Sequence, residues 1–223
     1  MRIHWTSIII SVLILAGGLL GARTLTRVDQ NLRVMHAEFT LAAADLGHVN
    51  GELIRYRTSI IRAIEADTKE GFLRIAASFP QKRDRIDRAI ERFVKASNDA
   101  SVGKRMDSRE LVELKAVREK LDDYIASSHR TIQLIEQRWN TASRIEAQRL
   151  RKEAENNAAK DAGAKLISVT LALDRLLDVV AEIAGDVKKD ADAKLRIETV
   201  VSVGVSLCLA ALVLILPARR GSA

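Results

Sequence analysis

The sequence predicts an all-α protein, an up-down-up-down antiparallel four-helix bundle flanked by two transmembrane helices. Only 2 of the 223 residues are Pro and 11 are Gly, and aromatic residues make up 4% of the chain. Apolar residues recur at heptad spacing through the middle of the chain, and an uncharged apolar stretch lies near each end. This composition and spacing favour long helices over strands.

The two apolar stretches are long enough to cross a bilayer. Residues 5–22 and 199–216 contain no charged side chain, and stretches of this length span about 27 Å at the helical rise of about 1.5 Å per residue. Arg2 precedes the first stretch, and Arg219 and Arg220 follow the second. Flanking positive charge predicts that both termini are cytoplasmic and that the central region lies outside the cytoplasm.

A cleavable signal peptide is the alternative reading of the first stretch. Arg2, the apolar core and the small residues at 16–18 fit its three regions. Against cleavage, the helical pattern continues through Ala22 into the central region. The predicted segments are a tail at 1–4, a transmembrane helix at 5–22, an extracytoplasmic bundle at 23–198, a transmembrane helix at 199–216 and a tail at 217–223.

The first helix of the bundle is predicted to run from the membrane to about Ala66. Its apolar positions alternate spacings of three and four, which is typical of packed helices. They are Leu25, Val28, Leu32, Met35, Phe39, Ala42, Leu46, Val49, Leu53, Tyr56, Ile60 and Ala63. A polar cluster at 67–71, ending in Gly71, predicts the helix end and a turn.

A second stripe of apolar positions predicts a helix that returns toward the membrane. It comprises Phe72, Ile75, Phe79, Ile86, Ala89, Phe93, Ala96 and Ala100. Lys82 interrupts the stripe, as a side chain that passes along the bundle edge or as a mark of an internal ligand. Pro80 predicts either a kink near 76–79 or a helix start with Ser78 as its cap.

The clearest loop lies at 98–107. Asp107 or Ser108 is the predicted N-cap of the third helix, and Glu110 is the predicted partner that completes a capping box. The third stripe is Leu111, Leu114, Arg118, Leu121, Ile125, Ser128, Ile132, Ile135, Trp139 and Ala142, with Arg118 and Ser128 as polar interruptions. Tyr124 and Trp139 are expected in the core or in a dimer contact.

The turn between the third and fourth helices has two candidate positions, 140–143 and 156–163, and the later one is favoured. The fourth stripe is Leu166, Val169, Leu173, Leu176, Val180, Ile183 and Val187. An isolated helix cannot bury such a stripe, so four of them predict a bundle whose helices lie about 20° from antiparallel.

Charge and motif content exclude several classes of function. The net charge is +7, but basic and acidic residues alternate along the helices, as at 82–92, so no basic platform for nucleic acid is expected. The four histidines are isolated, and no metal-ligand spacing or glycine-rich phosphate loop occurs. We therefore expect no enzyme activity, no metal and no cofactor.

Two sets of residues are candidates for function. Arg55, Arg62 and Arg74 fall with Arg57 toward the membrane-distal end of the first two helices, where they could bind an anion such as a carboxylate. The alternative is that they are ordinary surface charges paired with the acidic residues at 65, 67 and 70. Gly17 and Gly21 form a small-xxx-small pair that predicts close helix contact in a membrane homodimer.

The chain resembles the four-helix-bundle sensor domain of methyl-accepting chemotaxis proteins. The resemblance covers residues 1–216 and rests on the architecture and on the stretches GELIRYRTSIIR (51–62), ADTKEG (66–71) and DRIDRAIERF (84–93). It implies the bacterial inner membrane, a ligand or binding protein at the membrane-distal end, and a piston-like shift of the fourth helix. The family's cytoplasmic signalling part is missing after Leu216.

The resemblance leaves three readings of the function open. The first is a sensory, ligand-binding membrane module that acts as a homodimer or in heterodimers with full-length receptors. The second is a structural envelope protein, a helical spacer or scaffold without a small ligand. The third is a truncated piece of a longer receptor.

Overall fold

The computed structural model describes Gly21, Arg23, Thr26 and Val28 and residues 40–98 and 106–218, and gives only the backbone at 191, 194–195, 198–199, 202 and 205–218. The regular structure of these residues is entirely helical. The chain divides into two compact units, of which residues 37–183 are one and the flanking residues are the other. The bundle lies in the unit formed by residues 37–183.

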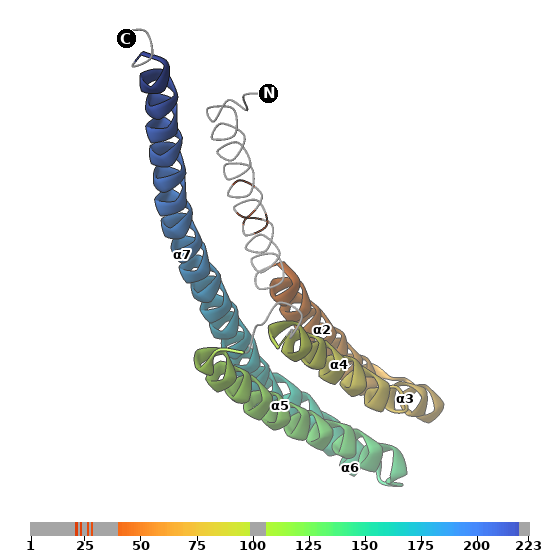
Figure 1. Cartoon of the computed structure of the whole chain (residues 1–223). Coiled ribbons are helices and arrows are strands. Elements are labelled where there is room, and N and C mark those ends of the chain that lie inside the picture. The colour runs from red at the N-terminus through yellow and green to blue at the C-terminus, as the bar shows by residue number, and fades with distance from the viewer. Residues whose placement is uncertain are drawn as a thin grey trace. The chain divides into compact units, whose positions relative to one another are not determined.

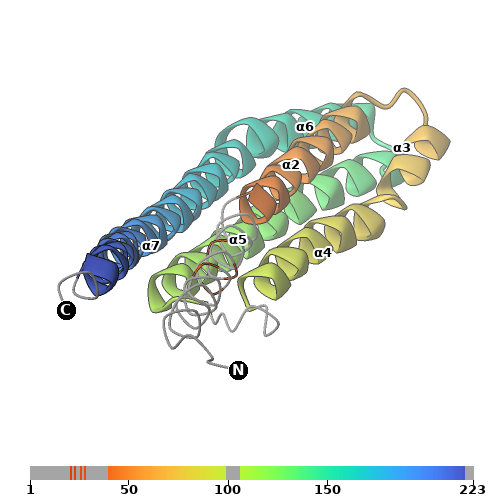
Figure 2. The same ribbon diagram turned by 45° about the horizontal axis from the view of Figure 1, so that its top comes forward.

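The bundle is built from helices in the order α2 (Ala42–Glu65), α3 (Lys69–Ala76), α4 (Phe79–Ser97), α5 (Ser108–Asn140), α6 (Arg144–Asn156), the π-helix η3 (Asn157–Asp161) and α7 (Ala162–Ala218). The helix α2 packs mainly against α4, and α5 packs mainly against α6 and η3 (Figures 1 and 2). The predicted all-α four-helix bundle is confirmed. Its second helix is the pair α3 and α4, and its fourth is α6, η3 and the start of α7.

The predicted stripe of α2 is confirmed where the structure describes it. Its buried positions include Ala42, Leu46, Val49, Leu53, Tyr56, Ile60 and Ala63. The helix ends at Glu65, as expected, and the chain turns through Thr68, whose hydroxyl accepts a hydrogen bond of 3.0 Å from the N–H of Gly71. Gly71 therefore lies in the first turn of α3 and not in the connection.

The second helix is interrupted rather than kinked. The helix α3 ends at Ala76 and α4 begins at Phe79, so Pro80 lies in the first turn, where its missing N–H costs nothing. Ser78 stands at the N-cap position, but its hydroxyl donates back to the carbonyl oxygen of Ile75 at 2.6 Å. Lys82 follows on α4 and is half-buried at the bundle surface.

The start of α5 is the predicted capping box. The Asp107 carboxylate accepts from the N–H of Arg109 at 2.8 Å, and the Glu110 carboxylate accepts from the N–H of Asp107 at 2.9 Å. The backbone hydrogen bond from Arg109 lowers the pKa of Asp107 below its usual value. Glu110, only 1% exposed, is fixed in this position.

The predicted stripe of α5 is confirmed at Leu114, Leu121, Ser128 and Ile135 but is wrong at Leu111 and Arg118. The core-facing series runs through Leu114, Val117, Leu121, Tyr124, Ser128, Thr131 and Ile135. Arg118 is exposed and Leu111 is 53% exposed, so neither faces the core. Tyr124 lies in the core, and Trp139 is partly buried against it, as expected. Two overlapping apolar series exist on this helix. Packing against the other helices determines which of them faces the core.

The favoured later turn between the third and fourth helices is wrong. The chain turns at Thr141–Ser143, where the Ser143 hydroxyl accepts from the N–H of Glu146 at 3.3 Å and caps α6. The stretch 156–163 stays helical and contains η3, because its polar side chains bind α5 instead of making a turn. The fourth stripe is confirmed from Leu166 to Ile183.

Among the residues searched, no helix is both long and apolar enough to cross a membrane. Of the first predicted span only Gly21 is described, and Gly17 lies outside the described residues. The second span falls in the last part of α7, where mainly the backbone is described. A Cβ on Gly21 would have no atom of the described chain within 4 Å.

Candidate ligand-binding site

A hollow of about 320 Å³ lies between α2 and the fourth helix of the bundle, and we call it the α2–α7 cleft. One wall consists of Ile60, Ile61 and Ile64 of α2. The opposite wall consists of small residues of η3 and α7, Ala158, Ala159, Ala162 and Gly163. Because small side chains lie opposite large ones, space is left between the helices. Both walls consist of apolar residues, so the cleft is mainly apolar inside.

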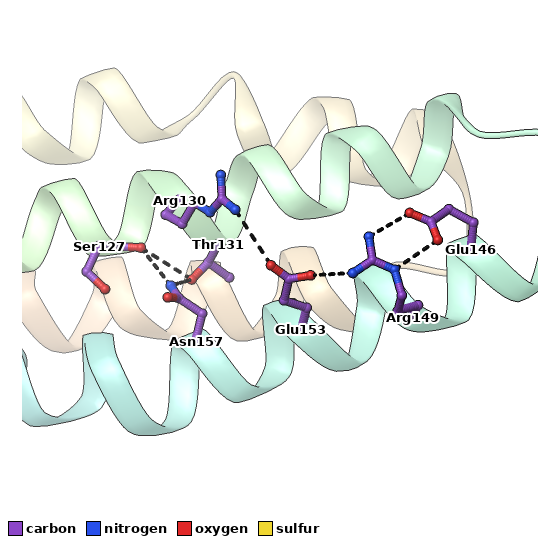
Figure 3. A network of polar contacts seen from close by, with 7 residues as sticks. All are labelled: Ser127, Arg130, Thr131, Glu146, Arg149, Glu153 and Asn157. Carbon is purple, nitrogen blue, oxygen red and sulfur yellow. Dashed lines mark hydrogen bonds and ion pairs between the residues drawn. The ribbon is translucent and has the colours of Figure 1, made fainter.

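The π-helix η3 is fixed to α5 by polar contacts, drawn in Figure 3. The side-chain amide of Asn157 donates to the carbonyl oxygen of Ser127 at 2.9 Å and to the hydroxyl of Thr131 at 2.8 Å. The Ser127 hydroxyl also donates to the Asp161 carboxylate, which lowers the pKa of Asp161. The two ends of η3 thus contact α5, while the alanines between and after them line the cleft.

A second set of contacts continues this network toward the turn. Glu153 pairs with Arg130 of α5 at 3.6 Å and with Arg149 at 3.1 Å, and Arg149 also pairs with Glu146 at 2.7 Å (Figure 3). These side chains are largely exposed, so each pair contributes little to stability. Their effect is to orient α6 on α5.

Tyr124 reaches the cleft from the core. Its ring is 1% exposed and meets the ring of Tyr56 edge-on, with centroids 6.0 Å apart. Burial raises the pKa of Tyr124 to about 12, an effect that the Ser128 hydroxyl and the charge of Arg57 partly oppose. In the described part of the chain, neither the Tyr124 nor the Ser128 hydroxyl has a hydrogen-bond partner of ordinary geometry. Such buried orphan groups are uncommon.

Charged residues surround the rim of the cleft. Arg151 pairs with Glu155 at 2.9 Å, so this cation is neutralised. Arg57 is exposed and forms no ion pair with any described residue. Glu65 places a carboxylate elsewhere on the rim. The anionic group of a ligand in the cleft would therefore be attracted to Arg57. The carboxylates of Glu65 and Glu155 would disfavour an orientation that brings this group close to them.

The structure separates the three arginines predicted as ligand contacts. Arg55 pairs with Glu52 on α2. Arg62 and Arg74 come together, with Lys82, around a shallow hollow of about 430 Å³ on α2, α3 and α4. This cationic hollow is lined by Ser59, Arg62, Gly71, Arg74, Ile75, Ser78 and Lys82. Among the described residues, no group of three or more His, Cys, Asp or Glu side chains is placed to bind a metal ion.

Sequence reasoning missed the α2–α7 cleft. The small residues Ala158, Ala159, Ala162 and Gly163 were its visible signal, but the same stretch also fits a turn. Tyr124, expected in the core or in a dimer contact, also lines this cleft, and that placement depends on how α5 packs against the other helices. The role of Arg57 at the cleft depends on which helix lies opposite α2, and the sequence of α2 does not contain that information.

Comparison with known proteins identifies the family. The family model described as a four helix bundle sensory module for signal transduction matches residues 1–195 of the chain. No curated protein and no solved structure matches it significantly. The match covers most of the 223 residues and agrees with the observed bundle. The chain therefore belongs to the family of four-helix-bundle sensory modules for signal transduction, as found in chemoreceptor sensor domains, which is a family of sensors and not of enzymes.

Proposed function

We propose that this protein is a membrane-anchored extracytoplasmic sensor whose bundle binds a small organic anion with an apolar body in the α2–α7 cleft. The observation that carries the proposal is the unpaired Arg57 next to the orphan hydroxyl of buried Tyr124, at the edge of an apolar hollow. A carboxylate would accept hydrogen bonds from both groups. Bonds of this kind to a charged group contribute about 1.5–3 kcal/mol each.

The walls of the cleft suggest the rest of the ligand. The isoleucines of α2 and the alanines of η3 and α7 offer apolar contact and few hydrogen-bonding groups. A branched aliphatic or aromatic carboxylate would bury its body there, with a gain of about 25 cal/mol for each Å² of apolar surface removed from water. A larger polar ligand would leave its own groups unpaired.

Signalling would pass through the fourth helix. A ligand that packs on Ala158 and Ala159 contacts the π-helix, the one element of the described bundle that departs from α-helical hydrogen bonding over five residues. Such widened turns occur often at functional sites. Because α7 continues as one helix to Ala218, a displacement at its start would be carried along its backbone hydrogen bonds.

The membrane location and the partner belong to the same proposal. The uncharged stretches at 5–22 and 199–216 support two spans, with both termini in the cytoplasm of a bacterium and the bundle outside it. Ile54, Ile167 and Leu171 are 57%, 61% and 55% exposed, and such apolar side chains support a homodimer or a heterodimer with a full-length receptor. Output would then come from the partner.

The test is calorimetric titration of the full chain in detergent. The probes are 4-methylpentanoate and benzoate, each compared with its uncharged amide. We expect saturable binding of the acids, much weaker binding of the amides, and a loss of about tenfold in affinity for Arg57→Gln. The matched control is Arg175→Gln, which removes an exposed arginine elsewhere on the bundle. No binding of either acid, or equal losses in the two variants, would favour the spacer reading.

A further inference from the structure

The cationic hollow differs from the rest of the bundle surface in its charge balance. Arg62, Arg74 and Lys82 come from three different helices, and no carboxylate lines the hollow. Within the described part of the chain, none of the three forms an ion pair. Three like charges around one hollow repel one another, and this repulsion persists in the free protein.

Acidic partners are available close by in sequence, yet they are not used. Glu65 follows Arg62 by three residues and Glu70 precedes Arg74 by four, spacings at which helical ion pairs form. Elsewhere the same spacings are paired, as in Arg83 with Asp87 at 2.9 Å. The three cations therefore line one hollow without a carboxylate partner among the described residues.

The interruption of the second helix brings these groups together. Because α3 ends at Ala76 and α4 begins at Phe79, Arg74 and Lys82 lie on separate helices, one on each side of the break. Lys82 is half-buried, so its aliphatic stem is held while its ammonium group can reach the hollow.

The hydroxyl groups in the hollow limit what it can bind. Ser59 and Ser78 already donate to the carbonyl oxygens of Arg55 and Ile75, at 3.0 and 2.6 Å. The remaining donors are therefore the guanidinium and ammonium groups, and Ile75 is the one large apolar residue of the lining. Such a lining favours multiple negative charges over an apolar body.

We propose that the cationic hollow is a second binding site, specific for small multivalent oxyanions such as inorganic phosphate or a tricarboxylate. The three cations match two or three negative charges, and the volume of about 430 Å³ accommodates either anion. This site is separate from the α2–α7 cleft, since the two share no lining residue. It can exist whether or not the cleft binds a ligand.

The test is calorimetric titration of the full chain in detergent with phosphate, citrate and acetate, at ionic strength held constant with sodium chloride. We expect saturable binding of phosphate or citrate, no saturable binding of acetate, and an affinity at least about tenfold lower in Arg74→Gln. Lys82→Met, which keeps the apolar stem, should give a similar loss. Circular dichroism establishes that each variant is folded.

The controls separate this site from general charge effects and from the cleft. Arg175→Gln and Arg57→Gln should both leave phosphate and citrate binding unchanged. Conversely, Arg74→Gln should leave any binding of 4-methylpentanoate unchanged. The proposal is overturned if neither multivalent anion binds at concentrations up to about 10 mM, if acetate binds as well as they do, or if Arg175→Gln weakens them equally.

Discussion

The side-chain amide of Asn157 donates a hydrogen bond of 2.8 Å to the hydroxyl of Thr131, across the contact between the fourth helix and α5. The same amide donates to the Ser127 carbonyl oxygen at 2.9 Å. Thr131 is 1% exposed, so water does not replace this contact if it is lost.

We expect Asn157→Ala to lower the free energy of unfolding by about 1–3 kcal/mol, because it removes two hydrogen bonds to α5, one of them to the buried Thr131 hydroxyl. The measurement is thermal and urea unfolding followed by circular dichroism. Asn140→Ala is the matched control, since Asn140 is exposed and accepts one bond of 2.8 Å from Lys69. Its effect should stay within about 0.5 kcal/mol. Equal effects of the two changes would show that the Asn157 contacts do not stabilise the bundle.

The capping box predicts a pH-dependent contribution to stability. We expect Asp107→Ala to cost about 1 kcal/mol at neutral pH, whereas Asp107→Asn should be nearly neutral, because both side chains accept the capping hydrogen bond. The lowered pKa of Asp107 means that its carboxylate stabilises the fold above the unfolded pKa of about 3.9 and that this part is lost as the pH falls through the folded pKa. Denaturant unfolding between neutral pH and pH of about 3 measures it.

The Asp107→Asn variant supplies the control for that titration. Its amide does not titrate, so its stability should fall less steeply in acid than that of the unmodified chain. Identical acid profiles would rule out a contribution from the Asp107 carboxylate.

The two tyrosines of the chain should ionise together with unfolding. Burial raises the pKa values of both Tyr56 and Tyr124 to about 12. A raised folded pKa means that the stabilising contribution is complete below the unfolded pKa of about 10 and is lost as the pH rises toward 12. Tyrosinate absorbance should therefore appear near pH 12, together with loss of helical dichroism. In denaturant the same titration should centre near pH of about 10, and a native titration there would contradict the burial.

Tyr124→Phe separates the role of the hydroxyl in binding from its role in folding. The hydroxyl has no hydrogen-bond partner of ordinary geometry among the described residues, although the Ser128 hydroxyl is close enough to lower its pKa, so we expect its removal to leave the melting temperature unchanged or higher. Binding of 4-methylpentanoate should weaken at the same time. A clear loss of stability would instead show that Tyr124 and Ser128 are hydrogen-bonded to each other in solution.

Cysteine crosslinking in native membranes tests the membrane homodimer. With Cys208 replaced by Ser, we expect Gly17→Cys and Gly21→Cys to form crosslinked dimers, because the two positions share a helix face. On the predicted helix, a spacing of two from Gly17 and Gly21 puts residue 19 on the opposite face, so Leu19→Cys should crosslink poorly. Monomers at all three positions would count against dimerisation through this helix.

Heptad spacing predicted the helices wherever a single apolar series exists. On α2, the predicted stripe positions between Ala42 and Ala63 are all buried, since no competing series is present on that helix. On α5, Leu111 begins one series and Val117 belongs to another. The choice between them depends on contacts with the other helices, so the local sequence could not determine the phase.

The turn and the cleft were beyond local reasoning for a related reason. Polar residues at 140–143 and at 156–163 carry similar turn propensity, and the difference is that Asn157 and Asp161 bind α5. The cleft forms only because α2 lies opposite η3, and this arrangement is not encoded in the local sequence of either helix. Arg62 and Arg74 line the same hollow, whereas Arg55 pairs with its own neighbour Glu52.

The π-helix also affects how the length of the fourth helix can vary. The buried positions Leu150, Ala154, Ala162 and Leu166 on its two sides are separated by multiples of four, a longer step than the average of 3.5 that a heptad stripe needs. A single widened turn takes up the surplus residue, so the helix on each side keeps its orientation toward the core. Related chains with one residue fewer between Asn157 and Asp161 would therefore keep both apolar faces inward, and this turn is where such a deletion would be tolerated best.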